Sequence, residues 1–303
     1  MKNALKKLAV IPVMLCILIS CIVPMWSSAA FNNEVKFDSN IVYMESLDQG
    51  TVIFSKNADE RTAIASLTKI TTAMVVLNNV KNLDTKITAT QSVMDTLANT
   101  NSSTAGITTG ETLTVRQLLS LMMVHSANEA ATILADYVGG GSISNFVGMM
   151  NSYAKKLGCT NTHYTNPHGL DDADHYSTAK DLSKIIKDAL KNDTFKKLVA
   201  QPTYTLEATN KRDAYTYPST NYLLNPESNY YYEACKGIKT GTTENAGQCL
   251  ASYATKNGYT YLLICIGGAD AYKKSSEEGT LGTNIAFNDS VRAYEWAFSN
   301  IKL

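Results

Sequence analysis

The 303-residue sequence has no excess charge of either sign, since 27 lysine and arginine residues balance 27 aspartate and glutamate residues. Nothing in this balance favours a nucleic acid or an acidic partner. Internal repeats and low-complexity linkers are also lacking, and no change in composition marks a second domain. These absences favour one large domain or two closely packed subdomains.

Cysteine is scarce after residue 30. The rest of the chain has only four cysteines, Cys159, Cys235, Cys249 and Cys265. None of them belongs to a Cys-x-x-Cys pair of the kind that binds zinc. Four cysteines in a domain of this size do not form a disulfide scaffold either. We therefore expect four buried free thiols.

A long apolar run lies at the N-terminus, from Leu8 to Val23, after a positively charged start and before the small residues Ser28 and Ala30. This order is typical of a signal peptide that covers residues 1–30 and directs export. Because the run is longer than a usual signal core, an N-terminal membrane anchor remains an alternative. Residues 18–21, Leu-Ile-Ser-Cys, also resemble a lipoprotein cleavage box.

Strand patterns lie at both ends of the remaining sequence, with helical patterns between them. The expected strands cover residues 41–44, 51–54, 237–241, 248–254 and 259–266, and the main expected helices cover 66–80, 115–122, the residues after 177, and 287–301. This order predicts an α+β fold in which N- and C-terminal strands close one antiparallel sheet. The middle of the chain then forms a mostly helical subdomain.

The pattern Ser-x-x-Lys occurs three times, at Ser66/Lys69, Ser152/Lys155 and Ser177/Lys180. Residues three apart on a helix lie close together, so such a lysine can take a proton from the serine. The lysine must first be neutral, and lowering its pKa from about 10.4 to near 7 costs about 4 kcal/mol. Burial can supply this shift, so the environment decides among the three pairs.

The helix that carries Lys69 has large apolar residues around nearly its whole circumference, which predicts a buried helix. Ser66 begins this helix, where the helix dipole favours developing negative charge. Lys155 and Lys180, in contrast, lie on polar, lysine-rich helix faces, and Ser177 is expected to be an N-cap. We therefore select Ser66 and Lys69.

Two further motifs follow in the chain. Ser126-Ala127-Asn128 interrupts a helical pattern and turns two polar side chains to one side. Lys239-Thr240-Gly241 lies on an expected strand, where the glycine lets a substrate approach and the other two residues can bind a carboxylate. Ser219-Thr220-Asn221 has the same form as the first motif, but it lies in a tyrosine-rich stretch without a helix interruption.

These three motifs in this order resemble the signature of penicillin-binding proteins and serine β-lactamases. Residues 64–70, 166–170, 175–179 and 237–247 resemble the low-molecular-mass D-alanyl-D-alanine carboxypeptidases in particular. The resemblance runs from about Asn40 to the C-terminus. It implies a β-lactamase/DD-peptidase-like fold, with a five-stranded antiparallel sheet flanked by helices, in a catalytic domain over residues 31–303. Neither a C-terminal β domain, nor a cofactor, nor a metal is expected.

The resemblance also implies a role for each residue of the first two motifs. Ser66 would attack the carbonyl of a terminal D-Ala-D-Ala bond, with Lys69 as the base. Ser126 would pass the proton to the leaving D-alanine, and Asn128 would orient the peptide and Lys69. Ala127 stands where glycine is usual, and a methyl group should be tolerated there.

The third motif would bind the substrate. Lys239 and Thr240 would hold its carboxylate, and Gly241 would allow its backbone to lie close to the strand. The N–H groups of Ser66 and Thr242 would form the oxyanion hole, at roughly 3 kcal/mol per donor. A further basic residue that binds the carboxylate in relatives has only weak candidates here, Lys273 and Lys274.

The implied partners are peptidoglycan stem peptides ending in D-Ala-D-Ala and β-lactam antibiotics, outside the cytoplasm of a bacterium. Three alternatives remain. A class A β-lactamase would need a Glu-x-x-Leu-Asn loop, which the sequence lacks, since residues 206–210 do not fit. A non-catalytic module that binds wall peptides would normally have lost a catalytic side chain. A zinc hydrolase would take its ligands from one polar stretch, namely His163, His168, His175, Asp171, Asp172 or Asp174.

Overall fold

The computed structural model describes residues 34–100, 102–268 and 284–301. The predicted leader over residues 1–30 and the candidates Lys273 and Lys274 lie outside these ranges. No helix in the described part of the chain is long and apolar enough to cross a membrane.

The central sheet has five antiparallel strands in the order β2-β1-β9-β8-β7. Its strands are β1 (Ile41–Ser46), β2 (Val52–Lys56), β7 (Cys235–Thr243), β8 (Gly247–Lys256) and β9 (Tyr259–Ile266). Strand β1 pairs with β9, so the N-terminal hairpin completes a sheet built from the C-terminal part of the chain, as predicted. Strand β7 is an edge strand, and one of its edges is therefore open to a ligand.

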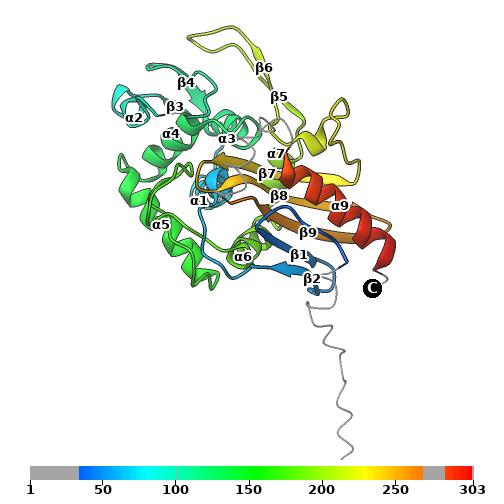
Figure 1. Cartoon of the computed structure of the whole chain (residues 1–303). Coiled ribbons are helices and arrows are strands. Elements are labelled where there is room, and N and C mark those ends of the chain that lie inside the picture. The colour runs from blue at the N-terminus through cyan, green and yellow to red at the C-terminus, as the bar shows by residue number, and fades with distance from the viewer. Residues whose placement is uncertain (1–33, 101, 269–283, 302–303) are drawn as a thin grey trace, which may run out of the picture.

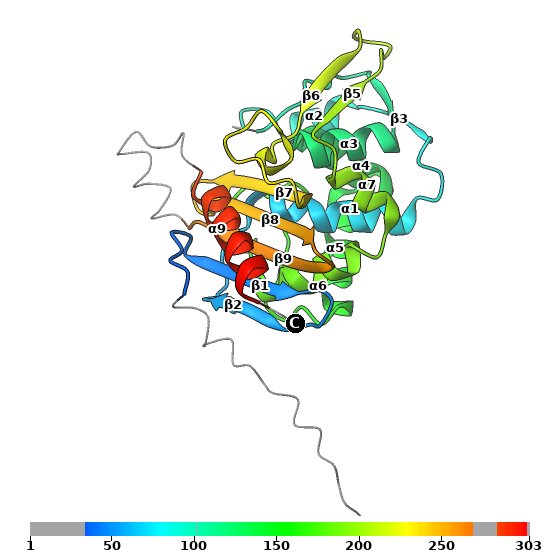
Figure 2. The ribbon, with the colours of Figure 1, turned by 90° about the vertical axis from the view of Figure 1, so that its right-hand side faces the viewer.

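Helices cover both faces of this sheet (Figures 1 and 2). Helix α9 (Ile285–Asn300) packs on β8 and β9, where the buried Phe287 and Tyr294 join one apolar cluster. On the opposite face, α6 (Ala179–Ala189) packs on β1 and β9 with the helical subdomain beside it. The α+β prediction is confirmed.

The helical subdomain consists of short helices and two small two-stranded antiparallel sheets. Its elements are η2 (Ala65–Leu67), α1 (Thr68–Asn79), β3 (Lys86–Thr88), α2 (Gln91–Asp95), β4 (Thr112–Thr114), α3 (Val115–Val124), α4 (Asn128–Val138), α5 (Ile143–Lys156), α7 (Asp193–Val199), β5 (Thr203–Leu206), β6 (Tyr215–Pro218) and η3 (Tyr222–Leu224). Figure 1 shows that the β5–β6 hairpin projects from the body, and both of its strands contact α3.

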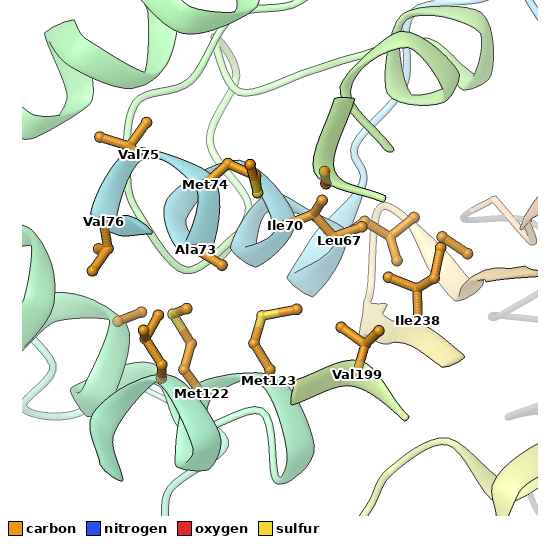
Figure 3. Close-up of a cluster of buried hydrophobic side chains, with 14 of the residues drawn as sticks. Leu67, Ile70, Ala73, Met74, Val75, Val76, Met122, Met123, Val199 and Ile238 are labelled. Carbon is orange, nitrogen blue, oxygen red and sulfur yellow. The ribbon is translucent and has the colours of Figure 1, made fainter. Parts of the chain in front are cut away.

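Helix α1 passes through the centre of the subdomain. Figure 3 shows Met74 and Ile70 of α1 above Met122 and Met123 of α3, with Ile238 of β7 near the start of the helix. From Thr68 to Val76 every residue of α1 is buried. The predicted buried helix is therefore confirmed, and any polar side chain on its first turns must find partners inside the protein.

Two local expectations were incomplete. Helix α6 is capped by Thr178 rather than Ser177, because Thr178 Oγ1 accepts the Asp181 N–H while Ser177 Oγ contacts Thr162 Oγ1. Helices α2, α5 and α7 and both two-stranded sheets were not predicted, although the last residues of α5 were expected to be helical. All four cysteines in the described residues are free and buried, as predicted.

Candidate active site

The first motif is built at the junction of η2 and α1. Lys69 is fully buried, and its Nζ lies within hydrogen-bond distance of three oxygens. These are Ser66 Oγ at 2.8 Å, Asn128 Oδ1 at 2.6 Å and the backbone oxygen of His168 at 2.8 Å. Three segments that are distant in sequence therefore meet at one amine.

This geometry suits a neutral lysine. Burial, and then the positive charge of Lys239, hold the pKa of Lys69 well below its usual range, while Glu129 acts in the opposite direction. A neutral amine has two N–H groups and one lone pair. The two carbonyl-type oxygens of Asn128 and His168 can only accept, so they take both N–H groups. The lone pair is then left for the hydroxyl of Ser66.

The second motif lies in the break between α3 and α4. Ser126 has a φ of 67°, which turns the chain before Asn128 begins α4. Ala127 is fully buried, and its N–H donates to Leu121 O at 3.2 Å. The methyl group of Ala127 thus packs in the core. The break directs Asn128 Oδ1 to Lys69.

The third motif lies on the edge strand β7, close to Ser66. A Cβ atom placed on Gly241 would lie 2.8 Å from the Ser66 nitrogen, so no other residue permits this approach. Burial lowers the pKa of Lys239 to about 7. The Oγ1 atoms of Thr240 and Thr220 are 2.6 Å apart.

A cleft of about 250 Å³ lies along this strand. It is lined by Ser66, Ser126, Thr240, Gly241 and Thr242 from the three predicted motifs, and by Ser103, Thr220, Tyr222, Asn284 and Phe287. The structure thus brings together residues from all three motifs, with the buried amine of Lys69 behind Ser66.

Sequence reasoning missed the second group of lining residues. Thr220 belongs to the Ser-x-Asn triplet that was set aside, yet it contacts Thr240. Tyr222 is 48% exposed, and its ring centroid lies 5.7 Å from that of Phe287. The tyrosine-rich stretch around these residues was the one available signal.

The loop of residues 166–170 packs against η2 and the first turns of α1, next to the nucleophile. Besides His168 O, it offers Pro167 O, which accepts a hydrogen bond from Thr72 Oγ1 at 2.6 Å. Gly169 has a φ of 91°, and a Cβ atom there would lie 1.9 Å from Ala65 O. Only glycine allows this loop to lie so close to η2.

The histidines of the metal-site alternative have structural partners. His175 Nδ1 accepts the Thr165 N–H at 3.1 Å, so its Nε2 carries the proton toward Thr68 Oγ1 at 2.8 Å. Burial lowers the pKa of His175 to about 4 and that of His168 to about 3, which keeps both rings neutral. In the described ranges, no three His, Cys, Asp or Glu side chains gather as a metal-binding group.

Comparisons with known proteins agree with this site. Residues 28–270 match the family model of D-alanyl-D-alanine carboxypeptidases (peptidase family S11). The chain is 38% identical over 223 residues to a D-alanyl-D-alanine carboxypeptidase of Streptomyces sp. strain K15, covering 70% of this chain and 75% of that protein. It is 30% identical to a D-alanyl-D-alanine carboxypeptidase of Bacillus subtilis, covering 84% of this chain and 64% of that protein.

A solved structure of a related enzyme has a similar fold. The crystal structure of the Streptomyces K15 DD-transpeptidase has a TM-score of 0.77 and 32% sequence identity, covering 88% of this chain and 98% of that one. The predicted fold, with its five-stranded antiparallel sheet and helices, is thereby confirmed. The chain belongs to the family of D-alanyl-D-alanine carboxypeptidases.

Proposed function

We propose that this protein removes the terminal D-alanine from peptidoglycan stem pentapeptides through an acyl-enzyme on Ser66. The observation that carries the proposal is the set of hydrogen bonds at Lys69 Nζ. Two of them use its N–H groups and the third joins it to the Ser66 hydroxyl. A neutral amine held in this way is the activating base that a serine nucleophile needs.

Acylation then proceeds in three parts. Ser66 Oγ attacks the carbonyl carbon of the penultimate D-alanine, and its proton passes to Lys69. The N–H groups of Ser66 and Thr242 stabilise the oxyanion. Ser126 passes a proton to the leaving D-alanine nitrogen as the peptide bond breaks, while Asn128 orients both Lys69 and the peptide. Water then hydrolyses the acyl-enzyme.

The edge strand β7 supports the binding half of the proposal. An extended peptide can add to an open sheet edge through main-chain hydrogen bonds. Lys239 and Thr240 would hold the free carboxylate at one end of this peptide, and Gly241 leaves room for its backbone. Since β-lactams carry a similar carboxylate beside a strained amide, the same groups would bind them.

Such substrates lie in the cell envelope, so we propose that the chain acts there, either secreted or tethered by its N-terminal apolar run. The relative from Streptomyces K15 is named both a D-alanyl-D-alanine carboxypeptidase and a DD-transpeptidase. The acceptor of the acyl group in this chain is proposed to be water.

Two measurements test the proposal together. The purified protein should release D-alanine from a disaccharide pentapeptide, and penicillin should form a long-lived adduct on the tryptic peptide that contains Ser66. The adduct should persist because none of the described residues that line the cleft carries a carboxylate that could activate a water for its hydrolysis. Rapid hydrolysis of penicillin would instead favour a β-lactamase.

The activity should fall on the alkaline side of neutrality. Lys239 must be protonated to bind a carboxylate, and its pKa of about 7 means that this charge is lost as the pH rises through 7. We therefore expect kcat/KM to decrease above pH 7, while kcat decreases only at higher pH because the bound carboxylate raises the pKa.

The Lys239→Arg variant should lose this alkaline decrease, because arginine stays charged at every accessible pH. Lys236→Arg, at an exposed position on the same strand, is the matched control and should keep the wild-type profile. A wild-type kcat/KM that stays constant from pH 6 to 9 would contradict the assigned role of Lys239.

A further inference from the structure

A buried carboxylate lies directly after the second motif. Glu129, in the first turn of α4, is only 2% exposed and belongs to none of the three motifs. Its Oε1 accepts three hydrogen bonds, from Thr104 Oγ1 at 2.7 Å, from Ala105 N–H at 2.6 Å and from Ile107 N–H at 3.3 Å. One oxygen therefore organises the segment of residues 103–107, which we call the 103–107 loop.

The other side of this loop is held by the β5–β6 hairpin. The carbonyl of Ala105 accepts hydrogen bonds from Arg212 Nη1 at 2.6 Å and from the Tyr217 hydroxyl at 2.7 Å. Arg212 is itself fixed by two hydrogen bonds to the fully buried carboxylate of Glu111, both 2.7 Å long. The peptide of Ala105 is thus clamped between the hairpin and Glu129.

The loop reaches the cleft through Ser103. Its backbone oxygen accepts the N–H of Asn128 at 2.9 Å, and Ser103 lines the cleft. Asn128 in turn places its Oδ1 2.6 Å from Lys69 Nζ. A continuous set of hydrogen bonds therefore leads from Glu129 through the loop and back to the amine of Lys69.

We propose that Glu129 is a positioning residue for acylation, because its carboxylate holds the 103–107 loop against α4 and so fixes Asn128 beside Lys69. This inference rests on the proposed function, in which acylation of Ser66 is the reaction supported. Glu129 does not touch the substrate and acts through Asn128.

The charge of Glu129 has a second effect on the same amine. The charged or titratable groups that act on Lys69 are Lys239 from β7, His168 from the loop below, which is neutral, and Glu129 from α4. Lys239 favours the neutral amine, whereas Glu129 favours the ammonium form. Glu129 therefore moderates the lowering of the Lys69 pKa that burial and Lys239 cause.

Glu129→Gln separates these two effects. A glutamine oxygen can accept the same three hydrogen bonds, so the loop should stay in place and the plateau rate of acylation should remain within about 3-fold of wild type. The negative charge is lost, so the pKa of Lys69 decreases and the acid limb of the acylation rate moves to lower pH. Glu129→Ala also releases the loop and should lower the acylation rate roughly 10- to 100-fold at every pH, the scale of a misplacement of about 1 Å.

The measurement is the second-order rate constant for labelling by a fluorescent penicillin between pH 5 and 9. Asp136→Ala, farther along α4, is the control and should leave the profile unchanged. Wild-type labelling by Glu129→Ala would overturn the proposal. If that variant does not fold, Glu129→Asp decides: its shorter side chain keeps the charge but cannot reach all three donors of the loop, so wild-type labelling by this variant would overturn the proposal too. Failure of the wild-type protein to label would contradict the proposed function itself.

Discussion

Replacement of Ser66 by alanine should abolish both penicillin labelling and D-alanine release. Ser66 Oγ is the hydroxyl that shares a hydrogen bond with Lys69 Nζ, and it lines the cleft. Without it the acyl-enzyme cannot form. Loss of the nucleophile in another serine peptidase lowers kcat by about 10⁶-fold, and we expect an effect on that order here.

The chain offers a matched control for this variant. Ser152 stands in the same Ser-x-x-Lys pattern, but it is exposed on α5, where its Oγ donates to Gly148 O at 2.8 Å. Ser152→Ala should therefore label like the wild type. Labelling that persists in Ser66→Ala, measured by gel fluorescence and by mass spectrometry of the intact protein, would show that the nucleophile is another residue.

Replacement of Lys69 by methionine should have the second largest effect. Methionine has a similar length and fits a buried site, but it has no base, so the Ser66 proton has no acceptor. General-base catalysis contributes roughly 10²- to 10⁴-fold, and the acylation rate should fall by about this factor at neutral pH. The rate constant of penicillin labelling measures the loss directly.

Folding of the Lys69→Met variant should be checked by thermal unfolding. The variant leaves Asn128 Oδ1 and His168 O without a donor, at about 1–3 kcal/mol for each unsatisfied group. The variant also no longer has to bury the polar amine of Lys69, and this gain offsets part of the cost. Lys155→Met, at an exposed position of the second pattern, is the control. An acylation rate within 10-fold of wild type in a folded Lys69→Met protein would exclude Lys69 as the base.

The environment of Lys69 was predictable because burial is encoded in residue type. The apolar residues around α1 require a buried helix, and a buried helix requires a buried lysine. The third partner of the amine was not predictable in this way. It is the backbone oxygen of His168, and every residue has such an oxygen. Only the folded path of the 166–170 loop determines which one lies beneath the lysine.

The other residues of the cleft also differ in whether the sequence alone could identify them. Ser66, Ser126 and Gly241 could be selected because each has a distinctive neighbour or interrupts a pattern. Thr220 could not, since its contact with Thr240 joins two segments 20 residues apart across an irregular loop. The helix cap was misassigned for a related reason, because Ser177 and Thr178 are adjacent and both residue types are good N-caps. Tertiary pairing of Ser177 with Thr162 left the cap to Thr178.

The amine of Lys69 joins groups that are 59 and 99 residues away along the chain, Asn128 and His168. Contacts of such sequence separation carry a high loop-closure cost and are associated with slow folding. Chemical reactivity at Ser66 is therefore acquired only after distant segments have met, later than the helices themselves need to form. In a refolding experiment, a pulse of penicillin would count completed molecules and would not react with partly folded ones that already have native helix content.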